Sequence, residues 1–242
     1  MKLVCTSDLH GDLPDPTTMP PGDVLVLAGD LLPDDFKPKF ASTVGGTRVE
    51  RQGWWFQHVF IPWLSDVKHI IPENPAGEWG RRYGKVVFTG GNHDWFLQAM
   101  LKAGIDKLLP KNCFYLNESS VEIDGKLFWG AGWNMTRGWA FALTEEEFAE
   151  KLQYAPNKID VAVVHGPPAG LVAPNGAKVA GHHCSTTLSD WVWKRTDIKT
   201  FICGHIHESY GNYTLNRTSV YVVSRKDRNY ADVNPFVEIT IG

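Results

Sequence analysis

The sequence of 242 residues lacks the features of several special protein classes. It has only four cysteines, which are widely spaced: Cys5, Cys113, Cys184 and Cys203. The absence of a C-x-x-C pair argues against a disulfide framework and for reduced thiols. No apolar run approaches the ~20 residues of a membrane span, and the first one, Leu3 to Cys5, is far shorter than a signal-peptide core. We therefore expect a cytoplasmic protein with no membrane partner.

Neither positive nor negative residues are in large excess, since the sequence has 24 Lys and Arg and 27 Asp and Glu, which give a formal net charge of −3. A strongly basic surface for nucleic acid is therefore absent, and nucleic acid is a possible but not a favoured partner. The sequence also has no fixed-period repeat or low-complexity tract. With 43% hydrophobic and 12% aromatic residues, the composition predicts one globular domain over residues 1–242. The sequence does not determine the oligomeric state.

Short apolar runs rich in β-branched residues alternate with longer amphipathic segments. The runs predict strands at Lys2–Thr6, Val24–Ala28, Lys85–Thr89, Lys126–Trp129, Asp160–Val164, Thr200–Cys203, Ser219–Val223 and Phe236–Ile241. The amphipathic segments predict helices at Arg48–Val67, Asp94–Ala103, Thr144–Leu152 and Ser185–Arg195. A hairpin over Val121–Trp129, turning at Asp124-Gly125, adds antiparallel pairing. The pattern predicts an α/β fold with mixed sheets.

Polar residues with metal-binding side chains follow the ends of the predicted strands. They occur as Asp8-Leu9-His10, Gly29-Asp30, Gly90-Gly91-Asn92-His93-Asp94, His165-Gly-Pro-Pro and Gly204-His205-Ile206-His207. In a layered α/β fold, strand ends are where a site is assembled from separate segments. Carboxylate oxygen and imidazole nitrogen without thiolate suit first-row ions such as Mn²⁺, Fe or Zn²⁺.

The spacing within these blocks allows a simple geometric hypothesis. Asp8 and His10 are two residues apart, so on a regular strand they share a face, and His205 and His207 repeat that spacing. Each pair can therefore converge on a single metal. Taken singly the signals are weak, because a lone Asp-x-His is usually a solvated turn after a strand.

The order of the blocks resembles the calcineurin-like metallophosphoesterase superfamily, whose pattern D-x-H, G-D, G-N-H-D, H and G-H-x-H is matched over Lys2 to His207. It looks closest to the branch with the class III cyclic nucleotide phosphodiesterases and the small MPPED-type proteins. That likeness rests on His165-Gly-Pro-Pro, Gly204-His-Ile-His-Glu208 and Val233-Asn234-Pro235. The resemblance implies a four-layer αββα sandwich of two mixed β-sheets flanked by helices, with a dinuclear metal site at strand ends.

The resemblance also implies roles for individual residues. One ion would be bound by Asp8, His10 and His207, the other by Asn92, His165 and His205, and Asp30 would bridge them. The ions would be divalent Mn²⁺, Fe, Zn²⁺, Co²⁺ or Ni²⁺, with Mn²⁺ favoured for activity. Two cations ~3.5–4 Å apart hold a bridging hydroxide and clamp the phosphoryl oxygens. Asn92 and His93 would contact the substrate, and His93 and Asp30 would be catalytic, with His93 protonating the leaving oxygen.

The function implied is hydrolysis of a small phosphoester, and a phosphodiester such as a cyclic nucleotide is expected over a monoester. The alternatives are a protein or nucleotide phosphatase on the same site and, less expected, a non-catalytic interaction module on the same fold. Retention of the complete ligand set argues against the interaction module, since a scaffold has no physical need for it.

Two carboxylate positions stay open in the sequence. Many family members carry an Asp that orients the histidine of the third block, and here Asp34 and Asp35, which follow Pro33, are both candidates to orient His93. Asp94 is expected to be structural, because an acidic residue in the first turn of a helix is favoured by the helix dipole.

Other conspicuous side chains have competing interpretations. His182, His183 and Cys184 form a cluster that could be taken for a metal site, but the implied ligand set is complete without them. A substrate-facing or a structural role is therefore expected. Trp79 and Trp139 lie in predicted loops, where their rings could stack a nucleobase.

Overall fold

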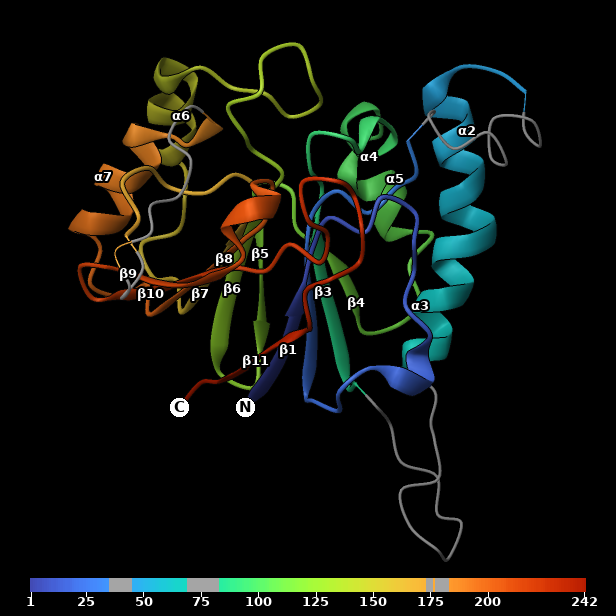
Figure 1. The fold of residues 1–242 in the computed structure, drawn as a ribbon, viewed down its shortest axis with the longest axis horizontal. Helices are drawn as coiled ribbons and strands as arrows, with labels where there is room; N and C mark the ends of the chain where they lie inside the picture. The colour runs from blue at the N-terminus through green and yellow to red at the C-terminus, as the bar shows by residue number, and fades with distance from the viewer. Residues whose placement is uncertain (35–44, 69–82, 173–175, 177–182) are drawn as a thin grey trace, which may run out of the picture.

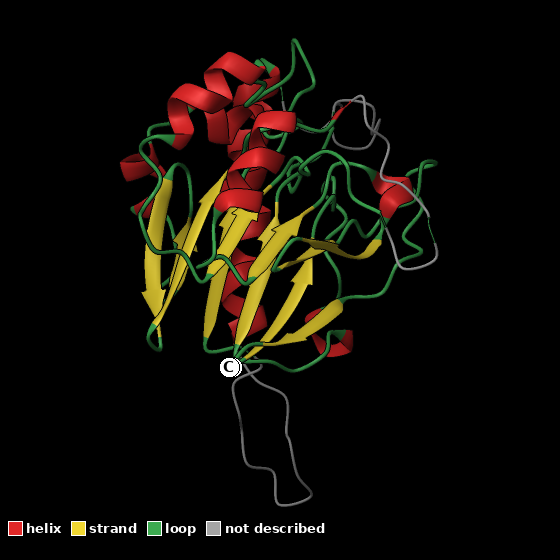
Figure 2. Cartoon of the chain, turned by 90° about the vertical axis from the view of Figure 1, so that its left-hand side faces the viewer, coloured by secondary structure: helices red, strands yellow, loops and turns green. Residues whose placement is uncertain are grey.

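A computed structural model describes residues 1–34, 45–68, 83–172, 176 and 183–242. Two β-sheets lie face to face, and helices cover the outer face of each (Figure 1 and, turned by 90°, Figure 2). Both sheets contain parallel and antiparallel pairs. The four layers of helix, sheet, sheet and helix are those that the resemblance predicted.

The first sheet has five strands in the order β11-β1-β2-β3-β4. Their bounds are β1 Lys2–Thr6, β2 Val24–Ala28, β3 Lys85–Thr89, β4 Cys113–Tyr115 and β11 Val237–Thr240. The pairs β1–β2, β2–β3 and β3–β4 are parallel, and β11 adds antiparallel to β1. All of β2 is buried, as expected for a central strand of a parallel sheet with both faces covered.

The second sheet has six strands in the order β5-β6-β7-β8-β10-β9. Their bounds are β5 Ser119–Ile123, β6 Lys126–Ala131, β7 Val161–Val164, β8 Thr200–Cys203, β9 Gly211–Leu215 and β10 Thr218–Val222. The predicted hairpin is the β5–β6 pair, which turns at Asp124 and Gly125 with φ of 49° and 76°. Two positive φ values in a two-residue loop match the right-handed twist of the strands.

The helices lie on the outer faces of the two sheets. Beside the first sheet run α2 Arg48–Trp55, a π-helical segment η2 Phe56–Phe60, and α3 Ile61–Lys68, with α4 Trp95–Ala99 and α5 Lys102–Asp106 nearby (Figure 1). Beside the second sheet lie α6 Glu145–Leu152 and α7 Thr186–Lys194. Short 3₁₀ turns occur at η1 Pro16–Thr18 and η4 His207–Ser209. Within the described ranges, no helix is long and apolar enough to cross a membrane.

Alternate residues of the central strands separate two apolar layers. Leu25 and Leu27 pack with the aromatic residues of α2 to α3, while Val24 and Val26 pack between the sheets with Val161. This alternation follows from the period-2 geometry of a strand. A third apolar cluster lies between the second sheet and α6 and α7. The strands are therefore held on both faces, which fixes the positions of the loops that follow them.

The predicted helix Arg48–Val67 runs to Lys68 and contains the π-helical segment η2, and three further differences from the sequence predictions are larger. The predicted helix Asp94–Ala103 is two short helices, because the backbone at Met100 and Leu101 is extended. The strand β4 was missed because it is a three-residue edge strand. The strand β9 was missed because it is an edge strand that begins with Gly211 and Asn212, which are poor strand formers.

Candidate metal centre

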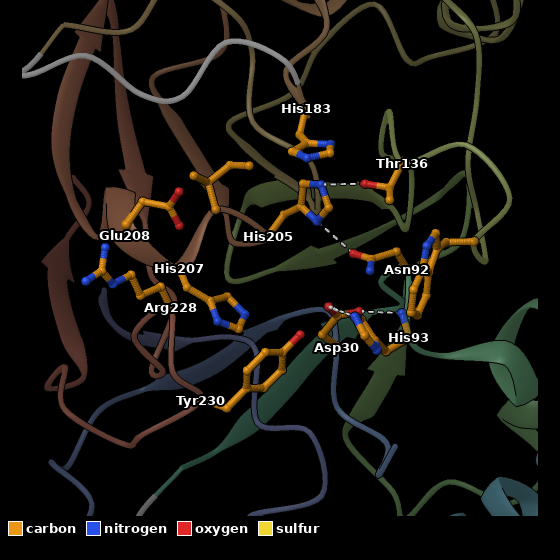
Figure 3. A pocket seen from close by; sticks show the side chains of 12 residues that line it. Asp30, Asn92, His93, Thr136, His183, His205, His207, Glu208, Arg228 and Tyr230 are labelled. Carbon is orange, nitrogen blue, oxygen red and sulfur yellow. Dashed lines mark hydrogen bonds and ion pairs between the residues drawn. The ribbon is translucent and has the colours of Figure 1, made fainter. Parts of the chain in front are cut away.

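The loops that follow β1, β2, β3, β7 and β8 meet at one end of the two sheets. They bring the predicted residues into a shared buried region: Asp8, His10, Asp30, Asn92, His93, His165, His205 and His207 (Figure 3 shows those that line the cavity). Hydrogen bonds join the two sheets here. The amide of His205 donates to Asp8 Oδ1 at 3.1 Å, and His165 Nδ1 donates to the Ala28 carbonyl at 2.8 Å.

The backbone reaches this arrangement through left-handed turns and not through extended strands. The φ angles are 57° at Asp8, 46° at His10, 53° at Asp30 and 71° at His205. Non-glycine residues rarely adopt this region, and such residues cluster at functional sites. The strand β1 already ends at Thr6, so the hypothesis that Asp8 and His10 share a strand face is wrong. The left-handed loop is what directs both side chains to one place.

The glycines of the motifs let these loops approach one another closely. A Cβ at Gly29, where φ is 91°, would lie 2.5 Å from both the Gly90 carbonyl oxygen and His165 Nδ1. A Cβ at Gly91 would overlap the carboxylate of Asp30. The glycine in front of Asp30 and the one in front of Asn92 are therefore steric requirements of the site.

One cluster of metal-binding atoms consists of Asp8, His10 and His207, whose donor atoms lie within 4.8 Å of one another. His207 Nε2 is 3.4 Å from both His10 Nε2 and Asp8 Oδ1. The outer nitrogens are occupied elsewhere: His10 Nδ1 donates to Asp34 Oδ2 at 3.0 Å, and His207 Nδ1 donates to the Asp227 carbonyl at 3.0 Å. The inner nitrogens therefore face the centre, where each can bind either a proton or a cation.

A second cluster consists of Asp30, His165 and His205, joined by Asn92. His165 Nε2 is 3.3 Å from Asp30 Oδ2. Asn92 Oδ1 lies 2.9 Å from His165 Nε2 and 2.7 Å from His205 Nδ1. The outer nitrogen of His205 meets the hydroxyl of Thr136 at 2.9 Å. Both imidazoles thus direct one nitrogen outward and the other to the centre.

Asp30 lies between the two clusters. Its Oδ2 is 3.3 Å from His165 Nε2 in the second cluster and 3.9 Å from His10 Nε2 in the first. Its Oδ1 accepts a hydrogen bond from the His93 amide at 2.8 Å. The hypothesis that His205 and His207 converge on a single metal is wrong, because they belong to different clusters.

The donor set fits two divalent cations. Metal-binding histidines almost always donate their second ring nitrogen to a carboxylate, a carbonyl or water, which fixes the tautomer. That pattern is present at His10, His165 and His207, and the Thr136 hydroxyl can play the same part at His205. Lone pairs that face lone pairs at about 3 Å repel unless a proton or a cation lies between them. Oxygen and imidazole ligands without thiolate suit a divalent first-row ion.

The charges of the centre shift the pKa values of its members strongly. Burial alone would raise the pKa of Asp8, but the hydrogen bond and charge of His207 hold it well below its usual range. Burial lowers the pKa of His165 and His207, yet the charge of Asp30 beside His165 and the hydrogen bond and charge of Asp8 beside His207 raise each to about 9. Burial and the charge of His165 lower the pKa of His205 to about 3. Protons therefore compete with metal for His165 and His207.

Asp34 orients His93. Its Oδ1 accepts from His93 Nδ1 at 2.5 Å, and its Oδ2 accepts from His10 Nδ1. The other candidate, Asp35, lies outside the described residues. Burial lowers the pKa of His93, but the charge of Asp30 and the hydrogen bond to Asp34 outweigh it and raise the pKa. Because Asp34 holds Nδ1, Nε2 is the ring nitrogen of His93 that is left to face the cavity. Asp34 supports two imidazoles from behind, so the group of His10, Asp34 and His93 does not require a third ion.

Two buried side chains hold the loops of the centre together. The fully buried carboxylate of Asp94 accepts from the amides of Leu31, Leu32 and Gly91 at 3.0, 2.8 and 2.8 Å. Its role is structural, as expected, but its side chain makes no capping hydrogen bond to the following helix and binds these loop amides instead. Burial and the charge of Asp30 raise the pKa of Asp94 to about 7. Sequence reasoning missed Gln52 of α2, which donates to the His93 carbonyl at 2.7 Å.

A cavity of about 330 Å³ opens above the centre (Figure 3). Sequence reasoning did not assign five of its lining residues to the site: Thr136, Ile206, Glu208, Arg228 and Tyr230. The last two lie in the loop after β10, and β10 runs parallel to β8, so its carboxyl end reaches the same edge as the metal-binding loops. That parallel pairing is the signal that could have found them. Burial and the charges of Asp34 and Asp30 raise the pKa of Tyr230 to about 12, which keeps its hydroxyl a neutral donor.

The aromatic residues and the His182–Cys184 cluster singled out in the sequence differ in their position relative to the cavity. Trp139 lines the cavity and packs against His93 with ring centroids 4.5 Å apart. His183 also lines the cavity, 5.6 Å from the ring of His205, which agrees with a substrate-facing position, while Cys184 is buried. His182 and Trp79 lie outside the described residues.

Comparison with known proteins agrees with this geometry. The sequence profile described as calcineurin-like phosphoesterase matches residues 1–209. The human Metallophosphoesterase domain-containing protein 1 is 27% identical over 267 residues, covering 99% of this chain and 71% of the relative. A UPF0046 protein of Caenorhabditis elegans is 30% identical over 242 residues, covering 87% of this chain and 52% of the relative. One crystal structure with 17% identity matches with a TM-score of 0.59 over 91% of this chain and 89% of its own, which supports the fold alone.

Proposed function

The chain belongs to the calcineurin-like phosphoesterase family, and on that premise we propose that it hydrolyses small phosphodiesters, such as 2′,3′- or 3′,5′-cyclic nucleotides, with two divalent metal ions. The family implies a metal-dependent phosphoester hydrolase. The observation that carries the proposal is the pair of buried clusters with Asp30 between them, open to a cavity of about 330 Å³.

The two clusters correspond to two ions. We assign one ion to Asp8, His10 and His207 and the other to Asn92, His165 and His205, with the Asp30 carboxylate shared between them. When bound, the ions would supply positive charge for the phosphoryl oxygens and would lower the pKa of an attacking water. A shared carboxylate reduces the repulsion between two cations. Among the admissible ions, Mn²⁺ is our choice for activity.

His93 supplies the proton for the leaving group. Asp34 holds its Nδ1–H, so Nε2 is the atom that faces the cavity and donates to the leaving oxygen. The raised pKa of His93 favours its protonated form, which is the form a general acid needs before the bond breaks. Asn92 remains close enough to the cavity to contact the phosphoryl group as well.

The charge of the cavity favours a diester. Among its described lining residues Arg228 is the only Lys or Arg, and Figure 3 shows Glu208 beside it. A phosphomonoester carries ~1.5 to 2 negative charges at pH 7, whereas a diester carries one. Because the cavity lining has so little positive charge, it contributes little extra affinity for the second negative charge of a monoester. Trp139 offers an aromatic surface near the centre, and stacking of a base on such a ring contributes ~1–3 kcal/mol.

We also propose a reducing, cytoplasmic environment and a small-molecule substrate as the partner of the site. All four cysteines of the chain lie within the described residues, where they are buried and form no disulfide. Proteins of reducing compartments keep such thiols without disulfides.

The test is a comparison of turnover on matched esters. Protein reconstituted with Mn²⁺ is given bis(p-nitrophenyl) phosphate and p-nitrophenyl phosphate, then cyclic nucleotides and the corresponding mononucleotides, and the series is repeated with Fe²⁺, Zn²⁺, Co²⁺ and Ni²⁺. We expect a higher kcat/KM for diesters. A tenfold or greater preference for monoesters would replace the proposal with a phosphatase. No turnover with any metal, in protein that holds two ions, would indicate the non-catalytic interaction module.

A further inference from the structure

Tyr230 occupies a position that nothing in the metal centre requires. It lies in the loop after β10, beyond the residues that the family profile matches. Its ring packs edge-on against His10 and His207, with centroid distances of 4.9 and 5.0 Å. Figure 3 shows its hydroxyl directed over Asp30, on the side of the centre away from His93.

The loop that carries Tyr230 is anchored from within by Lys226. This lysine is 2% exposed, and its ammonium lies 2.8 Å from both Asp12 Oδ2 and Asp232 Oδ1. It also donates to the Tyr230 carbonyl at 3.3 Å. Asp12 follows the first metal-binding loop, so the ion pairs fix the position of Tyr230 relative to that loop.

Asp227 connects Tyr230 to the centre a second time. The Asp227 carbonyl accepts from the amide of Tyr230 at 2.9 Å and from His207 Nδ1 at 3.0 Å. Its carboxylate accepts from the amides of Asn229 and Ala231 at 2.8 and 3.0 Å and so closes the turn. The group that orients the His207 imidazole thus also sets the position of the Tyr230 backbone.

The backbone of Tyr230 is strained. Its φ is 62°, a region in which a bulky side chain costs ~1–3 kcal/mol and a glycine costs nothing. The residue is 50% exposed, so the ring is only half-buried against His10 and His207. Within the described part of the chain, no protein group accepts a hydrogen bond from its hydroxyl. A strained, half-exposed tyrosine with a free donor above a buried polar centre points to a ligand as the missing partner.

We propose that Tyr230 is a substrate-binding residue whose hydroxyl donates a hydrogen bond to a phosphoryl oxygen, from the wall opposite His93. The inference rests on the proposed phosphoesterase function and adds a donor to it. His93 approaches Asp30 Oδ2 to 4.0 Å from the other side, so a phosphoryl group above Asp30 lies between the two donors. Because the phenol is neutral and binds the phosphoryl group and not the leaving oxygen, its effect should be the same for good and poor leaving groups.

Tyr230→Phe tests this directly, since it keeps the ring and removes only the hydroxyl. The first measurement is calorimetric binding of inorganic phosphate to the Mn²⁺-loaded protein, where the dissociation constant should rise ~10-fold, as for a lost hydrogen bond to a charged group. The second is kcat/KM on p-nitrophenyl and alkyl phosphodiesters, which should fall by the same factor on both. Metal content and the thermal unfolding midpoint should not change.

Tyr154→Phe is the matched control, because Tyr154 is 83% exposed and does not line the cavity, and it should match the wild type throughout. Wild-type phosphate affinity in Tyr230→Phe would overturn the proposal, as would a loss confined to the alkyl ester, which would make the residue a proton donor to the leaving group. If the wild type binds phosphate but hydrolyses no ester, the proposed function fails while the phosphate measurement still decides the role of Tyr230.

Discussion

Metal binding to this centre should depend steeply on pH, because protons and cations compete for the same nitrogens. His207 in the first cluster and His165 in the second each have a pKa of about 9 in the metal-free protein. Below that pH each imidazole carries a proton that must leave before its nitrogen can bind a cation. The affinity for metal should therefore fall as the pH falls below 9 and become constant above it.

The expected magnitude follows from the pKa values. At pH 7 each histidine lies two units below a pKa of about 9, and one unit corresponds to ~1.36 kcal/mol. Removal of each proton therefore costs ~2.7 kcal/mol at pH 7, which lowers the apparent affinity for each ion ~100-fold relative to its value above pH 9. Between pH 6.5 and 8.5 each affinity should rise ~10-fold per pH unit, and at pH 7 the two ions should together release ~2 protons.

The assay is calorimetric titration of the apoprotein with Mn²⁺ at pH 7 in buffers of different ionisation enthalpy, which gives the number of protons released. Two variants of the metal-binding histidines test which residue loses the proton. His207→Gln should lower the release by about one proton, because it removes a protonated ligand. His205→Gln removes a ligand that is already neutral, since its pKa is about 3, so the affinity should fall with no change in proton release.

His58→Gln provides the surface control, because His58 is exposed and bonded only to the Trp54 carbonyl of its own helix among the contacts of the described residues. It should leave both the affinity and the proton release unchanged. A proton release near zero at pH 7, or an affinity that stays constant from pH 6.5 to 8.5, would refute the reasoning.

Three further predictions follow from the contacts of single residues. Asp30→Asn removes the charge shared by the two clusters, so elemental analysis after Mn²⁺ reconstitution should find fewer than two ions per chain, with turnover abolished; full metal content would contradict this. His93→Ala should keep both ions but lower turnover ~10²–10⁴-fold. The loss should be smaller on p-nitrophenyl esters, whose leaving group needs little protonation. An equal loss on esters with good and with poor leaving groups would show that His93 only binds the phosphoryl group. Glu145→Ala should lower the free energy of unfolding by ~1–2 kcal/mol in urea denaturation, because its carboxylate accepts from Ser185 and the first amides of α7, whereas the exposed Glu146→Ala should have little effect.

The layers of the fold could be predicted because the strongest sequence signals come from the central strands. The bounds of β1, β2, β3 and β8 agree with the apolar runs, since the interiors of these strands are apolar and buried on both faces, and their polar residues lie at the ends. Edge strands such as β9 are held mainly by one partner strand, so their sequences carry little of that signal. The break at Met100 was likewise invisible, because no proline or glycine marks it.

The sequence could predict which residues lie close together at the candidate centre, but not the backbone geometry that brings them there. Asp8 and His10 converge through a left-handed loop, and period-2 reasoning about a strand applies only where the backbone is extended. His205 and His207 separate for the same reason, because β8 ends at Cys203 and a 3₁₀ turn begins at His207. The spacing selected residues that do lie together, but for an incorrect reason, and the order of all the blocks was the stronger signal.

The loop of Arg228 and Tyr230 illustrates why substrate choice is harder to predict than metal binding. A metal ligand needs one of a few residue types directly after a strand, and that requirement leaves a short motif. A substrate contact needs only a donor at the right place, and the position proposed for Tyr230 depends on the ion pairs of Lys226 with nearby Asp232 and with Asp12, which is far away in the sequence. No local pattern encodes such a position. Substrate preference within this fold should therefore follow the contacts that anchor this loop more closely than it follows the metal-binding residues.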